Sequence, residues 1–119
     1  MNCVEKGRRG EDLAAVFLLK NDYRIVNRNW RTKSGEIDIV AIDGDTLVFC
    51  EVKSRSSNCW GSGAEAVDFR KQQKIVQTAS LYLQRYRLNH CSCRFDVIEI
   101  QNIELQEPEI KHIKNAFCE

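Results

Sequence analysis

The sequence lacks the features that mark membrane, secreted and fibrous proteins. It has one proline in 119 residues and no biased tract, which excludes collagen-like and low-complexity chains. Its longest apolar run, Leu13 to Leu19, is far shorter than the roughly 20 residues of a membrane-spanning helix. The first residues contain no apolar signal segment. We therefore expect a cytoplasmic protein without a membrane partner, folded as one domain over residues 1–119.

Six cysteines are present, but they lack the spacing of a structural zinc site. The one cluster, Cys91-Ser92-Cys93 after His90, has no second ligand pair. In the expected cytoplasmic setting the cysteines are reduced thiols.

Acidic residues are absent from two long segments, although the net charge is only +1. The first segment, residues 23–35, carries four basic residues, and the second, residues 69–95, carries six. Segments of this kind suit contact with a phosphate backbone. Solvated helix faces explain them equally well.

Hydrophobic periodicity predicts an α/β domain. We expect a helix over residues 5–20, strands over 24–32, 36–42 and 46–53, a helix over 65–88, a strand over 94–101 and a short strand or turn over 110–113. The second helix has a candidate capping box from Ser62 to Glu65. The order αβββαβ predicts a mixed sheet with helices packed on it.

The hairpin around Asp43-Gly44-Asp45 carries the candidate chemistry. Side chains alternate along a strand, so Glu36 shares a face with Asp38, and Glu51 shares a face with Lys53. A two-residue loop at Asp43-Gly44 would pair Glu36 with Glu51, whereas a four-residue loop from Asp43 to Thr46 would pair Asp38 with Glu51. Either even-numbered loop puts all four groups on one face, and a three-residue loop would separate them.

Two carboxylates about 5 Å apart across a strand pair repel each other, and a divalent cation removes the conflict. Mg²⁺ is bound through one or two carboxylates, water and substrate phosphate. Glu51 follows an apolar run, so its charge also needs a partner. Lys53 would assist a metal-activated water or stabilise charge on a phosphate. The alternative is a surface hairpin with ordinary cross-strand ion pairs.

Two polar residues fall inside apolar helix faces and favour a polar pocket. Glu11 lies on the stripe of Ala14, Ala15 and Leu18, and Gln72 lies within the apolar arc of the second helix. Taken singly, they are explained by a favourable helix N-terminal position for Glu11 and by a backbone-bonded buried amide for Gln72.

The chain resembles the PD-(D/E)XK nuclease superfamily, and more closely the YraN-like family of small bacterial proteins. Asp38 followed by Glu51-Val52-Lys53 matches the D…(D/E)xK core. The further matching stretches are Gly7–Glu11, Gly35–Ala41, Phe49–Arg55, Lys71-Gln72, Arg94–Val97 and Ile113–Phe117. Ile37 stands where the superfamily name has proline, a departure shared by many members.

This resemblance implies a restriction-endonuclease-like αβββαβ core with Mg²⁺ or Mn²⁺ at Asp38 and Glu51. In resolvase-like members a glutamate of the first helix completes the acidic site, and Glu11 occupies that position. The expected catalytic residues are thus Asp38, Glu51, Lys53 and Glu11, of which the three acids bind metal. The nucleic-acid-binding candidates are Arg8, Arg9, Arg31, Lys33, Ser54, Arg55, Lys71, Gln72 and Lys74.

The expected function is hydrolysis of phosphodiester bonds in DNA, including structured or branched DNA, by a metal-dependent endonuclease. The alternative is a nucleic-acid-binding module with this fold and no turnover. A pure protein-interaction subunit would not need Asp38, Glu51 and Lys53. A domain of this size spans little duplex, so a homodimer that cuts two strands is consistent with the reading.

Overall fold

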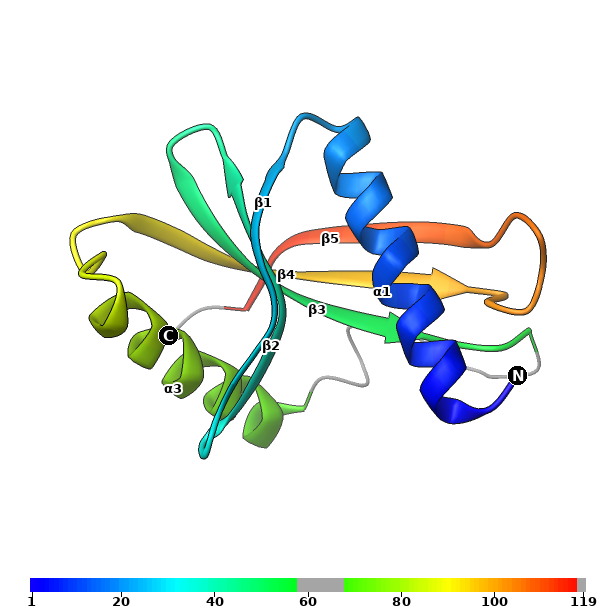
Figure 1. The fold of residues 1–119 in the computed structure, drawn as a ribbon, viewed down its shortest axis with the longest axis horizontal. Helices are drawn as coiled ribbons and strands as arrows, with labels where there is room; N and C mark the ends of the chain where they lie inside the picture. The colour runs from blue at the N-terminus through cyan, green and yellow to red at the C-terminus, as the bar shows by residue number, and fades with distance from the viewer. Residues whose placement is uncertain (58–67, 118–119) are drawn as a thin grey trace.

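The computed structural model describes residues 1–57 and 68–117 as a five-stranded mixed sheet with two helices (Figure 1). The elements are α1 (Cys3–Lys20), β1 (Arg24–Thr32), β2 (Gly35–Asp43), β3 (Thr46–Ser54), α3 (Phe69–Arg85), β4 (Ser92–Gln101) and β5 (Glu109–Phe117). The strands lie in the order β1-β2-β3-β4-β5. Among the described strands only β3 and β4 pair in parallel, and α3 lies in the crossover that parallel pairing requires. The predicted α/β architecture is confirmed and is compatible with a restriction-endonuclease-like core.

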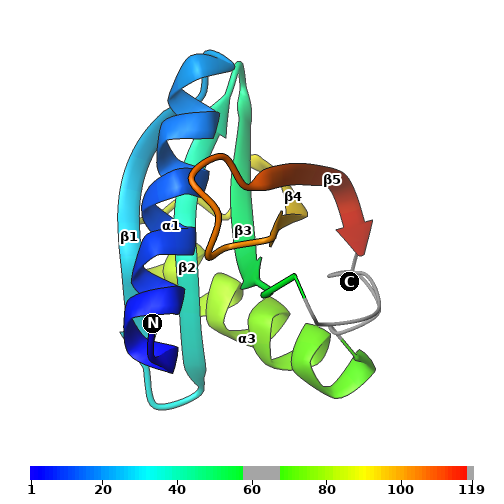
Figure 2. The ribbon, with the colours of Figure 1, turned by 90° about the vertical axis from the view of Figure 1, so that its right-hand side faces the viewer.

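Two apolar clusters hold the helices against the sheet. Ala14, Ala15 and Leu18 of α1 pack with one set of strand residues, which includes Ile39 and Cys50. The apolar side of α3 packs with another set, centred on Phe49 and Phe95. Successive strand residues such as Phe49 and Cys50 therefore face different helices. Figure 2 shows α1 running along the strands and α3 lying across the lower end of the sheet.

The helix starts differ from the predicted ones because of capping side chains. Asn2 accepts the N–H of Glu5 and starts α1 at Cys3, two residues before the predicted start. Asp68 has an extended backbone and accepts the N–H of Lys71, so α3 starts at Phe69. The predicted start at Glu65 was therefore too early. The proposed Ser62-to-Glu65 capping box lies outside the described residues.

The end of α3 and the extent of the last strand also differ from the predictions. Arg87 has a left-handed φ of 57°, and the N–H of Leu88 bonds to the carbonyl of Leu83. This Schellman-type arrangement ends α3 at Arg85 rather than at Leu88. The segment predicted over residues 110–113 is part of a nine-residue strand, β5. Its pairing with β4 shifts register between Phe95 and Val97, and this shift interrupts the simple alternation of apolar and polar residues that marks a strand in the sequence.

No helix of the described residues is long and apolar enough to cross a membrane. Within the same ranges Cys3, Cys50 and Cys91 are free thiols.

Candidate active site

The site forms where the pairing of β2 with β3 ends. Asp43 pairs with Thr46 across a two-residue turn at Gly44 and Asp45, and the ladder continues to Ile39 opposite Cys50. Continuing this register by one residue places Asp38 opposite Glu51. The second of the two expected pairings is therefore the observed one, although the turn has two residues because Asp43 and Thr46 also pair.

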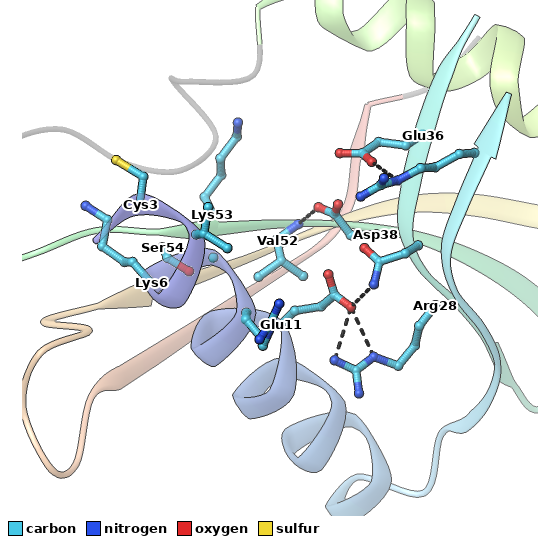
Figure 3. A pocket seen from close by; sticks show the side chains of 14 residues that line it. Cys3, Lys6, Glu11, Arg28, Glu36, Asp38, Val52, Lys53 and Ser54 are labelled. Atoms are coloured by element: carbon cyan, nitrogen blue, oxygen red, sulfur yellow. Dashed lines mark hydrogen bonds and ion pairs between the residues drawn. The ribbon is translucent and has the colours of Figure 1, made fainter. Parts of the chain in front are cut away.

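Asp38 turns its carboxylate toward β3 instead of continuing the ladder. Its Oδ2 accepts a hydrogen bond of 2.8 Å from the backbone N–H of Val52 (Figure 3). The strand pair thus ends on a side-chain acceptor, and the carboxylate is held beside the residue that follows Glu51.

Glu51 is buried and is neutralised by two lysines. Its side chain is 7% exposed, and its Oε1 lies 2.8 Å from Nζ of Lys71 and 3.5 Å from Nζ of Lys53. Lys53 comes from the same strand, two residues away, and Lys71 comes from the first turn of α3. A buried carboxylate needs such partners because its desolvation costs several kcal/mol, on the order of magnitude known for unpaired charges.

The pKa of Asp38 is raised to about 7. Burial is the main cause, the negative charge of Glu51 comes next, and the N–H of Val52 opposes both. Glu36 and Glu11 raise the pKa further by their charges. Asp38 therefore sits in a negative environment that favours a bound proton or another cation.

The two lysines differ in how readily they release a proton. Burial and the neighbouring Lys71 lower the pKa of Lys53. Burial is the largest single influence on Lys71 and acts to lower its pKa, but the hydrogen bonds to Glu51 and Lys53 and the charges of Glu51 and Asp38 together raise the pKa. Of the two ammonium groups, Lys53 is the one that gives up its proton first.

Glu11 lies on α1 beside this centre, but it is bonded to β1. Its Oε1 accepts hydrogen bonds from Nε of Arg28 at 3.1 Å and from Nδ2 of Asn29 at 2.8 Å (Figure 3). In the part of the chain that the structure describes, no three His, Cys, Asp or Glu residues come together as a group that could hold a metal ion. The structure brings Asp38 and Glu51 onto facing positions and leaves Glu11 in a separate network.

A cavity of about 530 Å³ opens between α1 and the ends of the first three strands (Figure 3). Glu11, Asp38 and Lys53 line it, together with several basic residues, namely Lys6, Arg8, Arg28 and Arg31. Glu51 instead lines a second cavity, of about 270 Å³, with Lys71 and Lys74. Glu36 borders both cavities, so the two openings approach each other at the acidic strand ends.

Sequence comparison gives the chain a family. The family described as "Uncharacterised protein family UPF0102" matches residues 10–100 of the chain. The chain belongs to the UPF0102 family. This membership confirms the family-level resemblance, and the matched range contains Glu11, Asp38, Glu51, Lys53 and Lys71.

UPF0102 proteins of distant bacteria resemble the chain along nearly its whole length. One from Clostridioides difficile is 46% identical and one from Caldicellulosiruptor saccharolyticus is 43% identical, each over 98% of this chain and 100% of the relative. One from Pseudomonas paraeruginosa is 40% identical over 98% of this chain and 94% of the relative.

The nucleic-acid-binding candidates of this UPF0102 chain occupy different surroundings. Arg8, Arg31 and Ser54 line the larger cavity, and Lys71 and Lys74 line the smaller one. Lys33 is exposed in the turn between β1 and β2, and Gln72 is half-buried on α3.

The two candidate arginines outside these cavities, Arg9 and Arg55, are engaged within the protein. Arg9 donates to the carbonyls of Ile103 and Leu105 at 2.9 and 2.8 Å. Arg55 lies 3.8 Å from Glu99. Arg9 therefore ties α1 to the connection between β4 and β5, which sequence reasoning did not anticipate.

Sequence reasoning also missed the partners of the acidic residues. Arg28 was visible only as one member of a basic segment, and nothing in the pattern assigned it to Glu11. Asn29 has a left-handed φ of 53° within β1, which lets consecutive side chains of one strand reach the same carboxylate. Lys71 was expected to face the site, but not as the closest partner of Glu51.

Proposed function

We propose that this UPF0102 chain is a divalent-metal-dependent endonuclease that hydrolyses phosphodiester bonds of DNA. The observation that carries the proposal is the position of Asp38 opposite Glu51, one residue beyond the β2–β3 ladder, with Lys53 beside Glu51. The resemblance of these residues to the PD-(D/E)XK core supports the same reading, and so does the arrangement of the fold.

The donor set fits Mg²⁺ or Mn²⁺. Asp38 and Glu51 offer hard carboxylate oxygens from adjacent strands, and Asp38 lies in surroundings that disfavour its own negative charge. These two residues would hold the cation. When bound, such a cation supplies Lewis-acid polarisation of the phosphoryl group and acidification of a bound water.

The remaining residues would position the substrate and move a proton. Lys53 lines the cavity and has a lowered pKa, so its amine would accept a proton from the attacking water or stabilise charge on the phosphate. Lys71 remains charged and would hold the Glu51 carboxylate in place. The basic side chains of the larger cavity would contact the DNA backbone.

A non-catalytic nucleic-acid-binding module has one observation in its favour. The lysines on either side of Glu51 already compensate its charge without a metal. In that case the acidic residues would serve as a structural network, and the basic segments alone would bind nucleic acid.

Cleavage assays on linear and branched DNA separate the two functions. Purified wild type, Glu51→Gln and Glu36→Gln are compared with Mg²⁺ or Mn²⁺, and circular dichroism confirms that each is folded. The proposal expects the Glu51 variant to lose at least about 100-fold in rate. It expects the Glu36 variant, altered at an exposed acid paired with Arg31, to lose less than about threefold. Folded wild type that binds DNA but cuts none of the substrates with either metal would establish the binding module instead.

A further inference from the structure

The network around Glu11 suggests how substrate and metal are coupled at this site. We propose that Arg28 is a positioning residue that holds Glu11 away from Asp38 and Glu51 until a phosphate of the nucleic acid replaces Glu11 as the partner of Arg28. Glu11 would then join Asp38 and Glu51 as the third carboxylate around the cation. The inference rests on the proposed function, because it concerns the same metal site.

Arg28 bridges two carboxylates of α1 from its place on β1. Its Nη2 lies 2.6 Å from Asp12 and 3.1 Å from Glu11, and its Nε donates to Glu11 at 3.1 Å. The Arg28 guanidinium thereby neutralises the Glu11 carboxylate, which a bound cation would otherwise coordinate. In this arrangement Arg28 competes with a metal ion for Glu11.

The exposures of the three side chains favour an exchange. The Glu11 side chain is 12% exposed, whereas those of Arg28 and Asp12 are 37% and 60% exposed. A ligand in the larger cavity can therefore reach the guanidinium, which lines that cavity with Glu11 and Asp38 (Figure 3). Asp12 lies outside the cavity lining and can remain a partner of Arg28 throughout.

The chemistry of the exchange balances in charge. A guanidinium binds a phosphodiester through two parallel N–H donors, as it binds a carboxylate. When a phosphate replaces the Glu11 carboxylate on Arg28, the freed carboxylate is compensated by the divalent cation. Asn29 still donates to Glu11, so the side chain keeps one hydrogen bond on the wall of the cavity.

The test measures Mn²⁺ binding by calorimetry in the Lys53→Met background, which keeps all three acids and is expected to slow turnover strongly. Parent protein, Arg28→Gln, Arg28→Lys and Arg31→Gln are titrated with and without a short DNA oligonucleotide. Arg31 provides the matched control because it belongs to the same strand and lines the same cavity, but pairs with Glu36. Thermal unfolding checks that each variant is folded.

The proposal expects Arg28→Gln to bind Mn²⁺ about three- to fivefold more tightly than the parent without DNA. Because the proposal confines the restraint by Arg28 to the DNA-free protein, the enhancement of Mn²⁺ binding by DNA should shrink by the same factor in this variant. Arg31→Gln should change the DNA-free affinity by less than about twofold, and Arg28→Lys should stay near the parent because it keeps the charge.

The outcomes separate this inference from the function on which it rests. If the parent binds Mn²⁺ through Glu51 and Arg28→Gln leaves the affinity unchanged or weakens it, the role of Arg28 is wrong and the metal site stands. If the parent binds no Mn²⁺ with or without DNA, the metal site itself is wrong and the role of Arg28 fails with it.

Discussion

The Oδ2 atom of Asp38 accepts a 2.8 Å hydrogen bond from the N–H of Val52, so a side chain of β2 holds the backbone of β3 immediately after Glu51. This bond fixes the two carboxylates of the site relative to each other. It also places Asp38 where burial and the charge of Glu51 raise its pKa to about 7.

The raised pKa predicts how the stability of the metal-free protein depends on pH. The pKa of Asp38 rises from its ordinary value of 3.8 to about 7 in the folded protein, so the folded state binds the proton more tightly than the unfolded chain. Its contribution to stability is fully present below about pH 4 and is lost as the pH rises toward 7. We expect Asp38→Asn, whose amide oxygen can still accept the Val52 N–H, to exceed the wild type in stability at pH 8.

A pKa change of this size corresponds to about 4 kcal/mol at most. The unfolding free energy of Asp38→Asn minus that of the wild type should therefore be a few kcal/mol larger at pH 8 than at pH 4. Urea unfolding of both proteins with a chelator at pH 4, 6 and 8 measures this gain. A stability difference that stays constant with pH would contradict the assignment of Asp38 as a destabilised carboxylate.

The close approach of α1 to β3 predicts that Gly10 does not tolerate a side chain. A Cβ atom at Gly10 would lie 1.7 Å from Oγ of Ser54 and 3.0 Å from its Cβ. Gly10→Ala should therefore cost about 1–3 kcal/mol of unfolding free energy. Gly7→Ala, in the same helix, has no atom within 4 Å of the added carbon and should stabilise the protein by about 0.5–1 kcal/mol.

Denaturant unfolding of the two alanine variants, of Ser54→Gly and of Gly10→Ala/Ser54→Gly distinguishes a local clash from general helix disruption. The double variant should be more stable than the sum of its single changes predicts, because Ser54→Gly removes the clashing atoms. Additive losses would show that Gly10 is required for another reason.

A buried network around Asp96, which pairs with Cys50 across β3 and β4, predicts a stability loss with the opposite pH dependence. Asp96 is 0% exposed and interacts with Nε2 of His112 at 2.7 Å, Nε of Arg94 at 3.0 Å and the N–H of Asn115 at 2.9 Å. Burial acts to raise the pKa of Asp96, but these hydrogen bonds outweigh it and lower the pKa. Its stabilising contribution is therefore present above about pH 4 and is lost as the pH falls through the lowered folded value.

We expect Asp96→Asn to lose about 3–5 kcal/mol at pH 7, because it leaves the buried partners without their countercharge. The loss should shrink in acid. Asp43→Asn removes another carboxylate bonded to Arg94, but one that is 38% exposed, and should cost less than about 1 kcal/mol. Thermal unfolding at pH 7 and at about pH 2.5 compares them, and equal losses in the two variants would argue against a buried network centred on Asp96.

The proposed role of Lys53 predicts that cleavage and metal binding respond separately to its loss. Lys53→Met removes the group that gives up its proton more readily but leaves Asp38 and Glu51 unchanged. Turnover should fall by about 100-fold or more, while Mn²⁺ affinity stays within a few-fold. Lys33→Met, in the exposed turn between β1 and β2, should raise KM and leave kcat nearly unaffected. If Lys53→Met lost metal binding and cleavage together, Lys53 would be acting on the ligands rather than on the reaction.

Much of the fold follows from local patterns in the sequence. The strand over residues 24–32 was predicted with its observed bounds, and β2 and β3 differ from prediction by one residue at some ends. The α3 boundaries were harder to predict because Asp68 and Arg87 act through backbone conformations that hydrophobic periodicity does not register. β5 was underestimated because its pairing with β4 shifts register and its residues alternate weakly.

The candidate site was predictable only as far as the hairpin determines it. An even-numbered turn was enough to bring Asp38 and Glu51 together, and the choice between the two registers required the observed pairing of Asp43 with Thr46. Glu11 was recognised as a polar residue on an apolar stripe, but its bonds to Arg28 and Asn29 depend on how α1 crosses β1. Contacts between elements far apart in sequence have no local signal.

The most direct test of the central claim is the position of Mn²⁺, located by anomalous X-ray scattering in crystals of Lys53→Met protein grown with a DNA oligonucleotide. The account predicts a peak about 2.1 Å from carboxylate oxygens of both Asp38 and Glu51. A Mn²⁺ peak elsewhere, with these two carboxylates still bonded only to Val52, Lys53 or Lys71, would contradict a metal-dependent nuclease centre at this strand pair.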